Sequence, residues 1–128
     1  MKHRETIALV LMILSTVGAL AAIFGYEQYR RATEFDVLLI ARAPEYGNWD
    51  PRTITVARGR PVRLHIRNID TGSHGFALPA FNVAIREIKA GTATTTTFTP
   101  DRVGEFLFLC TVWCSDRHIE MTGKLVVE

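Results

Sequence analysis

An uncharged apolar run from Ile7 to Phe24 constrains this chain more than any other feature of its sequence. As an α-helix, its 18 residues would extend roughly 27 Å, close to the hydrocarbon thickness of a bilayer. Tyr26 and Tyr29 follow the run where interfacial aromatic residues occur, and Arg30 and Arg31 provide charges that can reach lipid head groups. The segment is therefore predicted to be a membrane-spanning anchor helix.

A cleavable signal peptide is the alternative interpretation, because Ala19-Leu20-Ala21 resembles a small-x-small cleavage site. The apolar run is longer than the roughly 7–15 residues of a signal-peptide core, which favours the anchor. We therefore expect a cytoplasmic segment at residues 1–5, a transmembrane helix at 6–26, a linker at 27–35 and an exported domain at 36–128. Under this prediction the chain crosses the cell membrane once, and its domain lies on the periplasmic or extracytoplasmic side.

The rest of the chain has room for one small domain. About a hundred of the 128 residues lie outside the apolar run, enough for the core of a single β-sandwich or barrel. The 15 lysines and arginines nearly balance the 13 aspartates and glutamates, whereas a nucleic-acid-binding protein needs a clearly basic face. The 2 cysteines allow at most one disulfide. Large multidomain enzymes, nucleic-acid-binding proteins and disulfide-stapled folds are therefore excluded.

Several short segments of this domain have the patterns of β-strands. Along residues 61–67, Val62, Leu64 and Ile66 alternate with polar residues, which indicates a strand with one buried face. Further strands are predicted at Thr53–Val56, Thr94–Phe98, Glu105–Leu109 and Lys124–Val127, with turn signals at Gly59, Asp70-Thr71-Gly72 and Gly104 between them. No second helical pattern follows, so the domain is predicted to be an all-β Greek-key sandwich or barrel.

Soft metal ligands gather near the C-terminus. Cys110, Cys114, His118 and Met121 lie within twelve residues, directly after a predicted strand. Thiolate, imidazole and thioether groups together select copper rather than magnesium, calcium or manganese. A loop that leaves a strand can direct all of them to one point. A second imidazole has to come from elsewhere, and His74, in a predicted turn after the alternating strand, is best placed to reach the same end of the sandwich.

Each of these residues also has a simpler interpretation when it is taken alone. Cys110 and Cys114 could form a short disulfide in an exported domain, Met121 could be a core residue, and His118 could be a hydrogen-bonded loop histidine. Two cysteines and two histidines would also suit tetrahedral zinc. A methionine at this spacing argues against zinc. It suits a copper electron-transfer site, in which a weak axial thioether tunes the reduction potential.

With these residues the chain resembles the CuA-type cupredoxins, which comprise subunit II of haem-copper oxidases and the copper domain of nitrous-oxide reductase. The resemblance covers roughly residues 49–128. It includes the upstream pattern Pro51, Ile54-x-Val56, Gly59, Val62, Asn68, His74-x-Phe76 and Pro79. It implies a cupredoxin fold and a binuclear CuA centre of two copper ions. It also implies the ligands: Cys110 and Cys114 as bridging thiolates, His74 and His118 on one copper each, Met121 as a weak ligand, and the backbone carbonyl of Val112.

Two positions depart from the pattern of the oxidase subunits. These usually have glutamate where Val112 stands and glycine where Ser115 stands, and a valine keeps the carbonyl but cannot supply the carboxylate to a magnesium site. Trp113 and the stretch His118-Ile119-Glu120-Met121 look closer to nitrous-oxide reductase. This chain contains neither that enzyme's propeller domain nor its histidine-rich cluster, so we do not expect it to reduce nitrous oxide alone. Trp113 is expected either to lie on the route by which electrons enter or to pack over the loop.

The resemblance implies electron transfer, with no catalysis by this chain alone. We expect a small subunit II, or a partner like it, of a respiratory haem-copper oxidase or nitric-oxide reductase. Its electrons would come from a donor protein such as cytochrome c or another cupredoxin, since the sequence has neither a haem-attachment motif nor a nucleotide-binding glycine loop. Two alternatives stay open: a site for copper storage, delivery or sensing, and a copper-free binding module with a Cys110–Cys114 disulfide.

Overall fold

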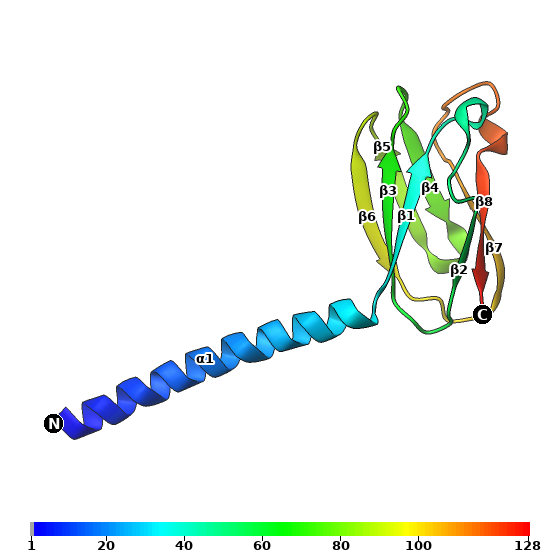
Figure 1. The fold of residues 1–128 in the computed structure, drawn as a ribbon. Coiled ribbons are helices and arrows are strands. Elements are labelled where there is room, and N and C mark those ends of the chain that lie inside the picture. The colour runs from blue at the N-terminus through cyan, green and yellow to red at the C-terminus, as the bar shows by residue number, and fades with distance from the viewer. Residues whose placement is uncertain (1) are drawn as a thin grey trace. The chain divides into compact units, whose positions relative to one another are not determined.

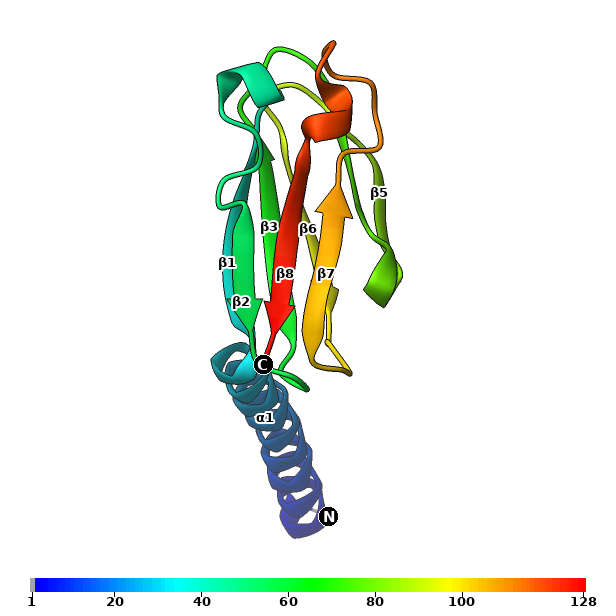
Figure 2. The same ribbon diagram turned by 90° about the vertical axis from the view of Figure 1, so that its right-hand side faces the viewer.

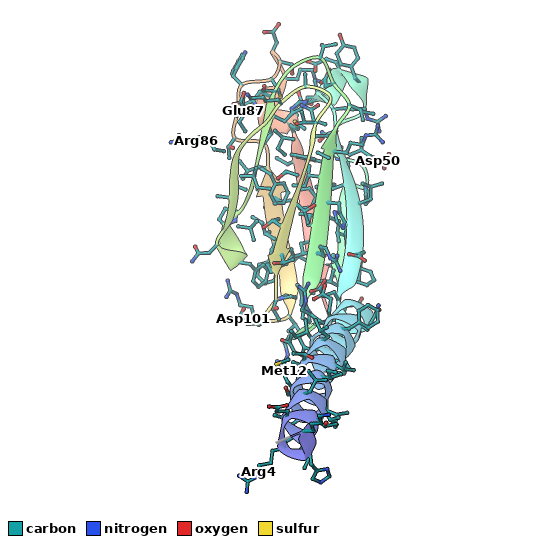
Figure 3. All side chains as sticks on the ribbon, turned by 90° about the vertical axis from the view of Figure 1, so that its left-hand side faces the viewer. Arg4, Met12, Asp50, Arg86, Glu87 and Asp101 are labelled. Atoms are coloured by element: carbon teal, nitrogen blue, oxygen red, sulfur yellow. The ribbon has the colours of Figure 1, made fainter. Side chains whose placement is uncertain are left out.

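The N-terminal part of the chain is a single long helix. The computed structural model describes residues 2–128, in which α1 runs from Lys2 to Thr33 (Figure 1). Met1, which begins the predicted cytoplasmic segment, and the side chain of Arg31 lie outside the described residues. Apolar side chains project all around the helix, as the labelled Met12 does in Figure 3. The helix is long and apolar enough to cross a membrane.

Helix α1 continues beyond the predicted anchor. Residues 27–33, most of the predicted linker, are helical as well. No glycine or proline interrupts the stretch from Tyr26 to Thr33, so nothing in it breaks the helix. Glu27 forms an ion pair with Arg30, one turn later, at 2.8 Å, which supports the last turns. The stretch between the helix and the first strand is correspondingly short.

Residues Glu34–Glu128 form a separate compact unit, a sandwich of two β-sheets (Figures 1 and 2). The first sheet has the order β1-β3-β6, with β1 at Phe35–Ala41, β3 at Val62–Asn68 and β6 at Ala93–Phe98. The second has the order β2-β8-β7-β4-β5, with β2 at Thr53–Val56, β8 at Thr122–Val127, β7 at Gly104–Leu109, β4 at His74–Leu78 and β5 at Val83–Ile88. Because β1 pairs in parallel with β3, and β2 with β8, both sheets are mixed. The predicted β-sandwich is confirmed.

The core between the sheets contains an aromatic cluster near the end at which β7 finishes. Trp49, Phe76 and Phe108 are fully buried. The indole of Trp49 meets the rings of Phe76 and Phe108 edge-on, at centroid distances of 5.6 and 6.0 Å. These contacts join the loop between β1 and β2 to strands β4 and β7. Charged side chains such as Asp50, Arg86 and Glu87 point away from this core (Figure 3). The cluster therefore fixes the strands from which the candidate site is built.

Five strands lie where the sequence predicts them, and β1, β4 and β5 are additional. The alternation along β3 is as expected, with Val62, Leu64 and Ile66 buried. The expectation that His74 lies in a turn is wrong, because it is the first residue of β4 and pairs with Ile88 of β5. The small residues around His74 resemble a turn in the sequence, but in the fold Gly75 allows the strand to approach its neighbours closely.

Candidate metal centre

The predicted ligands come together at one end of the sandwich. Strands β7 and β8 are antiparallel neighbours, and their last and first residues, Leu109 and Thr122, are partners. Residues 110–121 are therefore a long hairpin loop with its ends held together, and the Cys110 amide donates to the Met121 carbonyl at 3.0 Å. This loop, with the short turn η3 (His118–Glu120), lies at the same end of the sandwich as η1 (Pro44–Tyr46) in Figure 2. His74 reaches the loop from β4.

Each imidazole lies beside one of the thiols. Nδ1 of His74 is 3.8 Å from Sγ of Cys110, and Nδ1 of His118 is 3.5 Å from Sγ of Cys114. The ligand atoms of His74, Cys110 and Cys114 all lie within 4.8 Å of one another. Sδ of Met121 is 3.6 Å from Sγ of Cys114. The five side chains that the sequence singles out thus surround a single small volume, in two His–Cys pairs with a thioether at one side.

The Val112 carbonyl also faces this volume. Its oxygen is 3.3 Å from Sγ of Cys110, so the chain turns back toward the first thiol within two residues. Both cysteines are free in the structure, so the disulfide that the sequence left open is not formed. Cys110, Met121 and His74 are buried, whereas Cys114 and His118 are only partly buried. The donors therefore lie just beneath the surface.

Burial favours the uncharged forms of two of the donors, the Cys114 thiol and the His74 imidazole. Burial and the neighbouring Cys110 raise the pKa of the Cys114 thiol from 9.0 to about 11. Burial also lowers the pKa of His74, by more than its contact with Asp70 raises it. A soft metal ion would bind here by displacing the thiol protons, because the thiolate is the ligand form of cysteine. Two thiols, two imidazoles, a thioether and a carbonyl fit copper, and the buried thioether argues against zinc.

Asp70 orients the His74 ring, and the sequence did not single it out for this role. Its Oδ2 lies 3.2 Å from Nε2 of His74 and accepts the Ala43 amide at 2.8 Å, while Oδ1 accepts the Thr71 amide at 2.8 Å. Burial alone would raise the pKa of Asp70, but these hydrogen bonds and the His74 ring outweigh burial and lower the pKa. With Nε2 engaged by the carboxylate, Nδ1 is left to face Cys110. The sequence signal for this role was the position of an aspartate four residues before a candidate histidine ligand.

Gly75 allows β4 to lie against the ligand loop. A Cβ at this position would be 2.1 Å from Oγ1 of Thr111 and 3.1 Å from Cγ2 of Val112. The Gly75 amide points at Sγ of Cys110, at 3.4 Å. A Cβ at this position would collide with the Thr111 side chain, so glycine suits the close approach of this amide to the thiol.

Trp113 lies on the outside of the loop. Its side chain is 70% exposed, and its ring is 5.7 Å from the His118 ring, centroid to centroid, with the planes inclined by 39°. Ile119, which follows His118 in the chain, is 83% exposed. Trp113 therefore forms no part of the core, and it connects the His118 ring to the surface.

Comparison with known proteins identifies a domain family that this chain matches and several related proteins. The profile of the cupredoxin-like domain matches residues 15–127. The nitrous-oxide reductase of Pseudomonas fluorescens is 32% identical over 102 residues, 77% of this chain and 15% of that enzyme. Subunit 2 of cytochrome c oxidase from Thermus thermophilus is 30% identical over 95 residues, 74% of this chain and 67% of that subunit.

A solved structure shares the fold. The periplasmic domain of subunit II of cytochrome oxidase (CoxB) of Bradyrhizobium japonicum aligns with a TM-score of 0.63 and 20% identity, over 73% of this chain and 83% of that one. The chain spans only about 15% of the length of the reductases that it matches.

Proposed function

This chain belongs to the cupredoxin-like domain family, and on that basis we propose that it is a membrane-anchored electron-transfer protein with a binuclear CuA centre. It accepts electrons from a donor protein and passes them to a membrane-embedded partner. In this proposal the chain is the small subunit II, or a subunit II-like partner, of a haem-copper oxidase or nitric-oxide reductase. The relationship to subunit 2 of a cytochrome c oxidase supports that role.

The observation that carries the proposal is the pairing of one imidazole with each thiol. The pairs His74–Cys110 and Cys114–His118 would each offer one imidazole and one thiol to a copper ion, and the two thiols lie close enough to serve a single centre. Met121 and the Val112 carbonyl supply one further donor on each side of the thiols. A bound copper pair of this type would supply one-electron chemistry, cycling between a mixed-valence and a fully reduced state.

The protein's own residues provide a rigid, largely dry environment for that chemistry. The hairpin ends at Cys110 and Met121 are tied together, and both side chains are buried. Asp70 holds the His74 ring, so this imidazole is already oriented before a metal binds. Trp113 gives the centre a conducting aromatic contact at the surface beside His118, which suits a route for electrons from the donor. The donor we propose is cytochrome c or another cupredoxin.

The helix and the relatives support a place at the cell membrane. Under the proposal, residues 6–26 of α1 cross the bilayer once and the sandwich lies on the periplasmic or extracytoplasmic side. The chain spans a small part of the nitrous-oxide reductases, so the activity of those enzymes is not assigned to it. No catalysis is proposed for these residues alone.

Copper analysis combined with a reductive titration tests the function. The purified full chain, loaded with copper in detergent, is expected to hold two coppers and to take up one electron per pair. Cys110→Ser removes a bridging donor and is expected to abolish that stoichiometry, whereas Asp116→Asn, an exposed change in the same loop, is the matched control. A chain that holds one exchangeable copper, and gives it up readily to a chelator without a reversible redox step, would instead be a copper-storage, delivery or sensing protein.

A further inference from the structure

The loop between β1 and β2 folds back over the ligand loop. Gly47 and Asn48 have positive φ values of 127° and 67°, a backbone conformation that glycine and asparagine adopt more readily than other residues. This reversal turns the chain inward after η1, so that Asn48 and Trp49 are buried although their neighbour Tyr46 is 71% exposed. Two polar side chains are thereby directed toward the end of the sandwich that holds the candidate metal centre.

Both buried side chains donate to carbonyls of the ligand turn. Nδ2 of Asn48 donates to the Glu120 carbonyl at 2.8 Å, and the indole Nε1 of Trp49 donates to the Met121 carbonyl at 3.2 Å. Oδ1 of Asn48 accepts the Trp49 amide at 2.7 Å, which locks the pair together. The Met121 carbonyl also accepts the Cys110 amide. Two successive carbonyls beside the thioether are thus held by residues from 72 positions earlier in the chain.

This brace, the pair Asn48 and Trp49, acts on the backbone from which the thioether extends. The Met121 amide donates to the His118 carbonyl at 2.9 Å, so both sides of the Met121 backbone are fixed. Sδ of Met121 then lies at 3.6 Å from Sγ of Cys114. The Trp49 ring also packs on Phe76 and Phe108, each two residues from another predicted ligand, His74 and Cys110.

We propose that Trp49 and Asn48 are positioning residues that hold the Met121 thioether in place and thereby set the reduction potential of the copper centre. The inference rests on the proposed function. A weak axial ligand tunes the potential of a copper site, and its effect depends on where the sulfur is held. Loss of one brace hydrogen bond loosens the thioether, while the cysteines and histidines still bind the metal. The potential is therefore expected to change without loss of copper.

A comparison in two backgrounds tests the brace. Trp49→Phe keeps an aromatic ring but removes the N–H donor, and Asn48→Gly removes the amide while keeping a residue that tolerates a φ of 67°. Tyr46→Phe, an exposed change in the same loop, is the control. Each change is made in the full chain and again in the Met121→Leu chain, and the ratio of oxidised to reduced protein is measured in a spectroelectrochemical titration. Copper content and the EPR signal are followed in parallel.

The positioning role predicts a background-dependent effect. With Met121 present, Trp49→Phe and Asn48→Gly are each expected to change the oxidised-to-reduced ratio at a fixed potential by about two- to tenfold, the size expected for one buried hydrogen bond. In the Met121→Leu chain that change is expected to vanish, and Tyr46→Phe is expected to have no effect in either. Equal changes in both backgrounds, or no change in either, would overturn the proposal.

A measurement on the metal-free chain separates this proposal from the proposed function. Amide hydrogen exchange at Met121 is expected to speed up by about two- to tenfold in Trp49→Phe and Asn48→Gly, but not in Tyr46→Phe. An unchanged exchange rate at the Met121 amide would overturn the proposal that Asn48 and Trp49 hold Met121, even if the chain binds copper. A chain that binds no copper would overturn the proposed function and with it the role in the potential, whatever the exchange shows. If Trp49→Phe does not fold, Asn48→Gly carries both measurements.

Discussion

Replacing Gly75 with alanine tests how closely β4 must approach the ligand loop. The added Cβ would lie 2.1 Å from Oγ1 of Thr111 and 3.1 Å from both the Arg86 carbonyl oxygen and Cγ2 of Val112. The two longer contacts need shifts of only a few tenths of an ångström. The first is more than an ångström too short, so the Thr111 side chain has to turn away or the loop that carries it has to move. Because Thr111 follows Cys110 directly, a movement of the loop would displace the ligands as well.

The cost can be worked out from this contact. Overpacking of a tight site costs about 1–3 kcal/mol, and the lower chain entropy of alanine in the unfolded state returns about 0.4–1 kcal/mol. We therefore expect Gly75→Ala to lower the free energy of unfolding by about 1–2 kcal/mol. For a domain of this size each kcal/mol corresponds to about 4–8 °C in Tm.

A double-mutant cycle on the metal-free domain, residues 34–128, provides the assay. This unit has its own core and can be followed by thermal unfolding with circular dichroism. Thr111 is exposed, so Thr111→Ala alone is expected to change stability by no more than about 0.5 kcal/mol. Because it removes the atom at 2.1 Å, it is expected to recover most of the loss in the Gly75→Ala chain. Simple additivity of the two changes would refute this explanation of the glycine.

Three further predictions concern the donors themselves. The raised pKa of Cys114 means that folding favours the neutral thiol, so the metal-free domain should lose stability as the pH rises from 9.0 to about 11, and a flat unfolding profile over that range would contradict this. Asp70→Asn should weaken copper binding by about 10- to 100-fold in a chelator competition, because His74 loses its carboxylate; equal affinity would show that the ring needs no such partner. Met121→Leu should shift the reduction potential and leave the copper content unchanged, and loss of copper would show instead that the thioether is a required ligand.

The strands that the sequence predicts are those whose side chains alternate in a simple way. Val62, Leu64 and Ile66 face the core of a sheet whose other face is wet, so their period of two is visible in the sequence. Strand β4 was missed because all of its residues except Ala77 are buried, and because it begins among the small residues Gly72, Ser73 and Gly75. Its burial removes the alternation on which the prediction depends.

The candidate site likewise contains residues that the sequence predicts and residues whose roles appear only in the fold. The four ligands of the hairpin loop are close in sequence, so their spacing alone brought them together as a hypothesis. Asn48, Trp49 and Asp70 act through contacts with residues elsewhere in the chain, and their roles depend on which loops meet at one end of the sandwich. Gly75 is a similar case, because the need for glycine appears only when Thr111 is seen beside it. The sequence of one chain does not reveal which of its distant loops come into contact.

Electron paramagnetic resonance of the copper-loaded chain tests the central claim most directly. The account predicts a hyperfine pattern from one unpaired electron shared equally by two copper nuclei, which disappears in Cys110→Ser. A hyperfine pattern from a single copper nucleus, whether blue or non-blue, would contradict the binuclear centre.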